Sequence, residues 1–158
     1  MLKPAILYKD IIERKAYEIM YTDDYFYYIG YAHSCVPIEV KPQEGVYQWA
    51  ICDEDNIIGF ISYCLNAYTN SVDRFGLISF DKGNSVLASD VIQLLEKLIS
   101  EHRRIEWRCI EGNPVSKAYD HFCKRHNGYK AILHKCVIDD FGKYRDTYIY
   151  EIINDKTI

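Results

Sequence analysis

The sequence predicts an α/β (α+β) protein built on one mixed central sheet. Three observations lead to this class: an amphipathic helical pattern early in the chain, a strand-helix-strand unit between Phe75 and Ile110, and two alternating strands late in the chain. Strands joined by a crossover helix lie parallel and strands joined by a short turn lie antiparallel, so the sheet must contain both arrangements. The 158 residues include no linker-like segment, and residues 1–158 are therefore expected to form a single domain.

The first third of the chain is expected to be mainly helical. Apolar residues recur at helical spacing from Tyr8 to Met20, which predicts an amphipathic helix. The aromatic run from Tyr21 to Tyr31 and the proline-containing stretch from His33 to Gly45 follow as a second short helix and a loop.

A hairpin, a third strand and a long helix are expected next. Strand patterns from Val46 to Cys52 and from Ile57 to Leu65 flank a short polar turn, which predicts a β-hairpin. A further strand is expected from Arg74 to Phe80. The helix after it carries a single apolar stripe and is expected to end near Glu101. The stripe consists of Leu87, Val91, Leu94, Leu95 and Leu98.

The last third alternates again between strand and helix. A strand is expected from Ile105 to Ile110, followed by a helix from Val115 to His126 with Asn113 as its N-cap. Strand patterns from Ala131 to Ile138 and from Tyr144 to Ile153 surround a glycine-containing turn and predict a second hairpin.

Composition and charge exclude several classes of function. The formal charge of −4 and the short cationic cluster at residues 102–104 argue against nucleic acid as a partner. The sequence shows no signal peptide and no apolar run of the roughly 18 residues that span a bilayer, so we expect a cytoplasmic protein without membrane contact.

The cysteine pattern indicates reduced thiols rather than a metal or redox site. The six cysteines are scattered without a Cys-x-x-Cys pair, and we expect them to lie in the core as free thiols. His121, Cys123 and His126 would point in different directions on one helix, so no metal site is expected.

Tyrosine is unusually frequent, with 15 in the chain, and many of these residues crowd into the aromatic run. Tyr25, Tyr28 and Tyr31 are candidates to line a substrate pocket, because tyrosine combines an apolar ring with a polar tip. Packing within the core is the alternative for each of them.

The stretch FDKGNSVLASD, residues 80–90, lies between a predicted strand and the start of the long helix. Main-chain amides at a helix start have no partner within the helix and attract anions, here the amides of Ser85 to Ser89 with Lys82 beside them. In the alternative, Asn84, Ser85 or Asp90 caps these amides and the stretch is an ordinary turn.

A longer segment carries a resemblance to a known family. In EWRCIEGNPVSKAYDHFCKRHNGY a strand is followed by Asn113, by Tyr119 on the helix and by Gly128 and Tyr129 after it. This arrangement resembles the second acyl-CoA motif of the GNAT superfamily of acetyl-CoA-dependent N-acyltransferases. The tail DDFGKYRDTYIYEII is similar to the last hairpin of that family. The likeness extends from about Val46 to Ile153.

The family usually carries Q/R-x-x-G-x-G/A at the helix start. Here Gly83 stands at the first position, Val86 replaces the first glycine and Ala88 fits the last position. If the loop needs a left-handed residue at Val86, strain of about 1 to 2 kcal/mol would result, unless Gly83 or Asn84 supplies the turn instead.

The resemblance implies a fold and a cofactor. The fold is GNAT-like, with central strands that splay apart at Phe80 and Ile110, and the cofactor is acetyl-CoA, released as coenzyme A. The implied activity is transfer of an acetyl group to a primary amine of a small molecule or peptide, by direct attack in a ternary complex. The implied cofactor contacts are Ile78, Ser79, Phe80, Lys82, Gly83, Asn84, Ser85, Val86, Leu87, Ala88, Ser89 and Asn113.

Tyr119 is implied as the general acid that protonates the leaving thiolate, since a phenol keeps its proton at neutral pH. Glu39, Asp73 and Glu106 remain open as general bases. Acidic side chains and tyrosines near the acceptor side suggest a cationic or aromatic amine. The final hairpin leaves an edge strand through which a homodimer could form. The alternative to an enzyme is a GNAT-fold module that binds a ligand or protein without catalysis.

Overall fold

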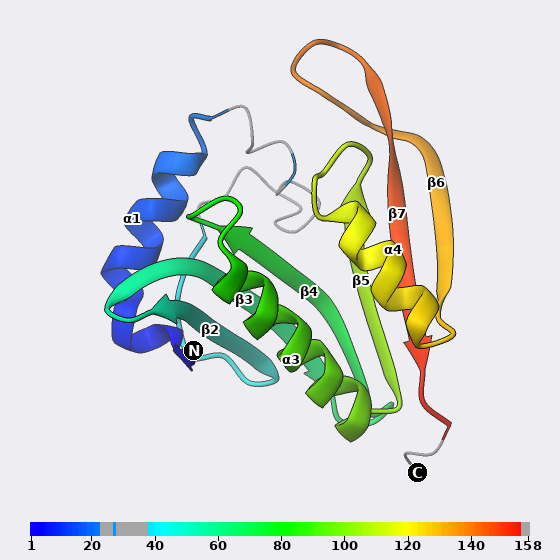
Figure 1. The fold of residues 1–158 in the computed structure, drawn as a ribbon, viewed down its shortest axis with the longest axis horizontal. Coiled ribbons are helices and arrows are strands. Elements are labelled where there is room, and N and C mark those ends of the chain that lie inside the picture. The colour runs from blue at the N-terminus through cyan, green and yellow to red at the C-terminus, as the bar shows by residue number, and fades with distance from the viewer. Residues whose placement is uncertain (23–26, 28–37, 156–158) are drawn as a thin grey trace.

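The computed structural model describes residues 1–22, 27 and 38–155, which form one seven-stranded sheet with helices on both faces (Figure 1). The strands lie in the order β1-β2-β3-β4-β5-β7-β6. The elements, in chain order, are β1 (Leu2–Pro4), the 3-10 helix η1 (Ala5–Tyr8), α1 (Lys9–Ile19), β2 (Val46–Asp53), β3 (Asn56–Asn66), β4 (Ser71–Ser79), α3 (Ser85–Glu101), β5 (Arg104–Ile110), α4 (Ser116–Arg125), β6 (Tyr129–Ile138) and β7 (Tyr144–Ile153).

The sheet is mixed, as predicted. Among the strands described, β4 and β5 pair in parallel, and every other neighbouring pair is antiparallel. Helix α3 is the crossover that joins the two parallel strands. β1 was not predicted, because three residues are too few to display a strand period. It pairs with β2, where Leu2 lies opposite Ile51.

Two layers of core enclose the sheet. α3 and α4 cover one face and lie in front of β3, β4 and β5 in the view of Figure 1. The predicted apolar stripe of α3 is buried against this face. α1 covers the other face, where Ile12 packs with Phe60 and Ile78. The central strand β3 is buried over most of its length because it has helices on both sides.

The two parallel strands separate partway along their length, as the predicted fold requires. Their pairing runs from Ser71 opposite Arg104 to Phe75 opposite Trp107. Beyond this point β4 stays paired with β3, and β5 stays paired with β7. Each strand is therefore held by its outer neighbour while the inner edges part (Figure 1).

A β-bulge lies just before the strands separate. Asp73 and Arg74 together face Glu106 across the parallel pair, because Val72 pairs with Ile105 and Phe75 with Trp107. Arg74 adopts a left-handed backbone with φ of 51°. An extra residue in one strand bends it and redirects the neighbouring side chains.

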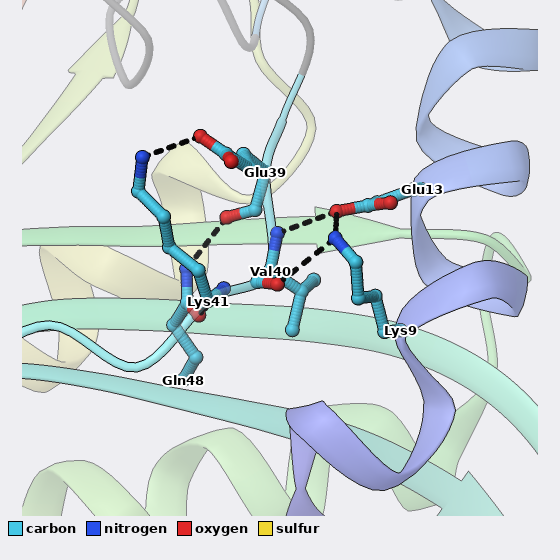
Figure 2. Close-up of polar contacts among 6 residues, drawn as sticks. All are labelled: Lys9, Glu13, Glu39, Val40, Lys41 and Gln48. Carbon is cyan, nitrogen blue, oxygen red and sulfur yellow. Dashed lines mark hydrogen bonds and ion pairs between the residues drawn. The ribbon is translucent and has the colours of Figure 1, made fainter.

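The segment that follows residue 37 is fastened to α1 by polar contacts (Figure 2). Glu13 accepts a hydrogen bond from the amide of Val40 at 2.8 Å and pairs with Lys9, which donates to the carbonyl of Val40 at 3.1 Å. Gln48 of β2 donates to the carbonyl of Glu39 at 3.0 Å. This segment is thereby fixed between α1 and the sheet.

Several sequence predictions need correction or fall outside the described residues. The short helix and loop expected between residues 21 and 45 lie largely outside them. α4 begins at Ser116 with Val115 in the capping position, although the predicted cap, Asn113, accepts a hydrogen bond from the amide of Val115 at 3.1 Å. Cys136 is exposed rather than in the core, because β6 is an edge strand.

The five described cysteines are free thiols, and three of them are buried. Cys35 lies outside the described residues. No helix in the described ranges combines the length and apolar character that crossing a membrane requires.

Candidate active site

A cavity of about 740 Å³ opens where β4 and β5 part. Its walls come from both strands, from the loop and first turn of α3, and from the turn that leads into α4. Tyr27, which precedes β2 in the chain, Tyr119 of α4 and Thr147 of β7 also line it. The size falls within the usual range for small-molecule sites.

The cavity collects most of the site residues predicted from the sequence. They come from two separate segments, residues 79–88 and residues 113–119, which the parting of the strands brings to one space. The predicted residues in the lining are Ser79, Lys82, Gly83, Asn84, Ser85, Leu87, Ala88, Asn113 and Tyr119.

Four predicted cofactor contacts do not line it. The side chains of Ile78 and Phe80 pack with the core on the α1 face. Val86 packs against the core beneath α3, and Ser89 is exposed and accepts a hydrogen bond from Gln93 at 3.0 Å. Successive side chains of a strand point to opposite faces, and those of a helix point around its axis. Consecutive residues of a motif therefore cannot all face one cavity.

The predicted acceptor residues Tyr25, Tyr28 and Tyr31 lie outside the described residues. Their neighbour Tyr27 lies in the cavity wall.

The start of α3 is a capped turn. Asn84 is the N-cap, and its side-chain oxygen accepts hydrogen bonds from the amides of Val86 at 2.9 Å and Leu87 at 3.4 Å. Its side-chain nitrogen donates to Asp81 at 2.8 Å. Gly83 supplies the left-handed residue with φ of 78°, and a side chain there would meet nothing within 4 Å. Val86 is helical, so the strain considered for that position does not arise.

This turn fits an anion in part. Within the described residues, the amides of Gly83 and Ser85 have no hydrogen-bond partner, and a helix of 17 residues adds its dipole. The carboxylates of Asp81 and Asp53 lie close by, the latter 3.5 Å from the Asn84 side-chain nitrogen, and they oppose negative charge. An anion there would be held mainly by Gly83, Ser85 and Lys82.

Asn113 forms a rigid turn at the end of β5. Its amide donates to the carbonyl of Ile110 at 3.1 Å, and its own carbonyl accepts from Ser116 at 3.0 Å. The side-chain oxygen is engaged with the amide of Val115. Asn113 therefore lines the cavity while it fixes the entry into α4.

Tyr119 stands on the first turn of α4 and is 5% exposed. Its ring meets Trp107 and Tyr150 edge to face, with centroid separations of 5.8 and 5.9 Å. The hydroxyl of Tyr150 donates to Asp120 at 2.8 Å, and burial followed by this bond raises the pKa of Tyr150 well above its usual value. Of these two tyrosines only Tyr119 lines the cavity.

The three arginines in the cavity wall were missed from the sequence, whereas Asp73, Glu106 and Lys82 were among the predicted residues. Arg104, Glu106 and Arg108 alternate with buried residues along β5 and line the cavity with Asp73 and Arg74 of the bulge. The pattern RIEWR contains the signal, since residues two apart share one face of a strand.

The three candidates for a general base differ in whether they reach the cavity. Asp73 and Glu106 line the cavity. Glu39 does not, and it is exposed and paired with Lys41 at 2.6 Å (Figure 2). Glu106 is held by Arg104 at 2.6 Å and by Arg108 at 3.5 Å.

Cys109 also lines the cavity, as a buried thiol that contacts the carbonyl of Ile110 at 3.6 Å. Burial raises the pKa of Cys109 to about 12. The thiol is therefore a poor nucleophile at neutral pH.

Two solved structures with a similar fold are acetyltransferases. A probable GNAT-family acetyltransferase from Chromobacterium violaceum is 22% identical over 70% of this chain and 60% of its own, with a TM-score of 0.54. The spermidine/spermine N-acetyltransferase SpeG from Vibrio cholerae is 16% identical over 70% of this chain and 66% of its own, with a TM-score of 0.57.

The protein smu.2055 of Streptococcus mutans is similar over almost the whole length, 97% of this chain and 98% of its own, with 17% identity and a TM-score of 0.64. No protein-family model and no curated protein matches the sequence. The chain spans about 60% of the length of the Chromobacterium protein. At these identities the likeness establishes the architecture, and the chain has the fold of the GNAT superfamily, a mixed α/β sheet with parting central strands.

Proposed function

We propose that this protein transfers an acetyl group from acetyl-CoA to a primary amine of a small molecule or protein, by direct attack in a ternary complex. The observation that carries the proposal is the cavity between β4 and β5, which joins the α3 start, Asn113 and Tyr119 in one space within a GNAT fold.

The residues present suit the cofactor in most respects. The inner edges of β4 and β5 border the cavity without pairing to each other, and their main chains would hold the pantetheine arm. The residues concerned are Gly76, Leu77, Ser79, Arg108, Cys109 and Ile110. Lys82, Gly83 and Ser85 would hold the phosphates, and Asn113 would contact the arm. The bound cofactor supplies an acetyl group activated as a thioester.

Tyr119 would supply the proton that the chemistry needs. The neutral amine attacks the carbonyl carbon, a C–N bond forms, the C–S bond breaks, and the amine loses its proton to water or to a nearby carboxylate. The Tyr119 hydroxyl donates a proton to the departing thiolate, which has comparable basicity. Transfer through Cys109 is disfavoured because its raised pKa of about 12 leaves almost no thiolate.

A GNAT-fold module that binds a ligand or protein without catalysis is the second candidate. The observation that favours it lies at the start of α3. The Asn84 side chain occupies the amides of Val86 and Leu87, and Asp53 and Asp81 add negative charge where a pyrophosphate would lie.

Titration calorimetry with acetyl-CoA and with coenzyme A separates the two candidates. We expect micromolar binding of both, weakened several-fold by Lys82→Gln, because one cationic donor to a phosphate is lost. Ser89→Ala is the matched control, since Ser89 lies in the same segment but outside the cavity, and it should bind as the unaltered protein does. No binding at millimolar cofactor would exclude the enzyme.

We further propose a cytoplasmic location, supported by five described cysteines that are free thiols, as is usual in a reducing compartment. Cell fractionation followed by detection with an antibody tests it.

We also propose a homodimer that forms through the edge strand β6, on which Ile132 and Leu133 are 45% and 43% exposed. Light scattering should give twice the mass of 18.6 kDa, and Leu133→Lys should return it to the monomer value. A monomer in the unaltered protein at high concentration would contradict this.

A further inference from the structure

We infer that the acceptor is a free α-amino acid, recognised as a zwitterion by Arg108 and Arg74 for its carboxylate and by Asp73 for its ammonium group. This inference rests on the proposed function, because it identifies the amine that the acetyl group would reach. It differs from the cationic or aromatic amine that the sequence suggested.

The first step of the argument is the direction of the β5 side chains. Ile105, Trp107 and Cys109 are buried in the core beneath α3 and α4. Arg104 and Arg108 must then point to the other face of the sheet, together with Glu106 between them. The charged row therefore lies on the α1 face of the cavity, opposite the helix that carries Tyr119.

The second step is the balance of charge around this row. With the neighbouring charged residues of β4 and β7, the row forms a cluster of three arginines and three carboxylates: Arg74, Arg104, Arg108, Asp73, Glu106 and Glu151. A polyamine would require an excess of carboxylates, and a dianion would require an excess of arginines. A neutral cluster suits a ligand that carries one charge of each sign.

The third step is which of these charges are already neutralised. Arg104 donates to Glu151 at 2.5 Å and to Glu106 at 2.6 Å, and these two bonds raise the pKa of Arg104. Arg108 meets the same Glu106 only at 3.5 Å, and its side chain is 43% exposed. Within the described residues, Arg74 and Asp73 form no ion pair. Among the residues that the structure describes, Asp73 and Arg74 thus carry no ion pair and Arg108 carries only a long one. The Arg74 side chain also hydrogen-bonds the Cys64 thiol, a weak acceptor that a carboxylate would outcompete.

The fourth step is the bulge that presents two of these groups. Asp73 and Arg74 share the space opposite Glu106, and Arg74 is held there in a left-handed backbone with φ of 51°. Such a conformation costs about 1 to 3 kcal/mol outside glycine and is concentrated at binding sites. It places groups of opposite charge on adjacent residues, which suits an amine and a carboxylate bound to one carbon atom.

Guanidinium forks bind carboxylates through two parallel hydrogen bonds, which gives Arg108 or Arg74 the selective contact. Asp73 accepts from the ammonium group until that group loses its proton and can attack. An acceptor that lacks the carboxylate leaves the guanidinium groups without an anion, and an amide cannot restore the charge-assisted bonds.

The test compares matched acceptors at saturating acetyl-CoA, with thiol release as the assay. The panel contains the common L-amino acids, the α-amide of each, and spermidine. We expect at least one amino acid to be acetylated with kcat/KM about 10- to 100-fold above that of its amide, the range that a charge-assisted contact supports.

The variants locate the contact. Arg108→Gln should lower kcat/KM for the preferred acid about 10- to 100-fold, mainly through KM, and should lower it less for the amide, so that the preference for the acid over its amide decreases. Arg103→Gln is the matched control, because Arg103 is exposed beside the same strand but does not line the cavity. Acetyl-CoA affinity measured by calorimetry and the circular dichroism spectrum should be the same in both variants.

Two results would overturn the inference while acetyl transfer stands. One is equal or better turnover of amides or spermidine. The other is acetyl-CoA binding with neither turnover nor calorimetric binding of any amino acid in the panel. Failure of the proposed function has a different signature, which is the absence of acetyl-CoA binding. In that case, amino acid binding that Arg108→Gln abolishes would still support the zwitterion site, and its absence would remove it.

Discussion

At the scale of single residues, similar side chains have different tasks because their surroundings differ. Tyr119 and Tyr150 pack against the same Trp107, and Tyr150 stacks on it at a centroid distance of 5.2 Å. The Tyr150 hydroxyl is bound to Asp120, whereas Tyr119 borders the cavity. Only the second position suits a proton donor to a ligand.

Tyr119→Phe should lower turnover about 100-fold, the lower part of the range for general acids, and leave acetyl-CoA affinity nearly unchanged. The ring keeps its contacts with Trp107 and Tyr150, so the fold should be retained. Steady-state kinetics and calorimetry on the same preparation measure both effects. Unaltered turnover would remove Tyr119 from the mechanism.

Gly128 illustrates a residue whose role is steric. The sequence predicts that Asn127 and Gly128 together end α4. In the structure Asn127 supplies the left-handed turn with φ of 52°, and the Gly128 amide donates to the carbonyl of Cys123 at 2.8 Å. A Cβ atom on Gly128 would come within 2.7 Å of Cys123 Sγ, of the carbonyl of Glu151 and of Ile152 Cγ1.

We therefore expect Gly128→Ala to lower the free energy of unfolding by about 2 to 3 kcal/mol through overpacking. Urea unfolding measures the loss. Lys124→Ala, an exposed change on the same helix, should stay within about 0.5 kcal/mol. A Gly128→Ala protein as stable as this control would show that the packing relaxes freely.

At the scale of elements, strand period and helix capping set what the cavity contains. The alternation along β5 sends Trp107 to the core and Arg108 to the α1 face, so one strand serves both the hydrophobic core and the charged row. The start of α3 is shaped by Asn84 and Gly83, and its neighbour Ser85 faces the cavity. Structure and binding depend on the same few residues.

Asn84→Ala should lower the free energy of unfolding by about 1 kcal/mol, because the amides of Val86 and Leu87 lose their cap. It should also tighten or preserve acetyl-CoA binding, since these amides become available to a phosphate. Urea unfolding and calorimetry give the two values. Loss of stability together with loss of binding would mean that the Asn84 side chain itself holds the cofactor.

At the scale of the whole molecule, carboxylates in distant places respond to pH in the same direction. Hydrogen bonds from Lys9 and from the Val40 amide lower the pKa of Glu13. Backbone amides, first that of Lys143, lower the pKa of Asp139, and the amide of Lys135 lowers that of Asp146.

Lowered carboxyl pKa values mean that the unfolded chain binds more protons in acid. Their contribution to stability is complete above about pH 5 and is lost as the pH falls through the folded values. In the alkaline range the Cys109 thiol has the opposite effect, because burial raises its pKa to about 12. Its contribution to the free energy of unfolding is lost as the pH rises above about 8.5.

Burial also lowers the pKa of His102 from its usual value of 6.5. The free energy of unfolding should therefore be highest from about pH 6.5 to 8 and fall on both sides. Urea unfolding across a pH series measures this. Glu13→Gln should reduce the acid-side slope, while stability that increases below pH 4 would contradict the assignment of these carboxylates.

Much of the fold follows from local patterns in the sequence. The apolar stripe of α3 predicts its buried face, and the two hairpins follow from alternating strands around short turns, because these signals depend on residues close in the chain. The motif around Asn113 and Tyr119 indicated the correct fold and two cavity residues. β1 was missed because its identity depends on pairing with β2.

The sequence by itself determined the order of the elements from β2 to β7 and the mixed sheet, since both rest on local periodicity. It left the left-handed turn before α3 open between Gly83 and Asn84, and the structure places it at Gly83. Only the tertiary structure decided where β4 and β5 part, that Ile78 and Phe80 face α1, and that a bulge brings Asp73 and Arg74 opposite Glu106. These features depend on register between strands more than 30 residues apart, which no local pattern encodes.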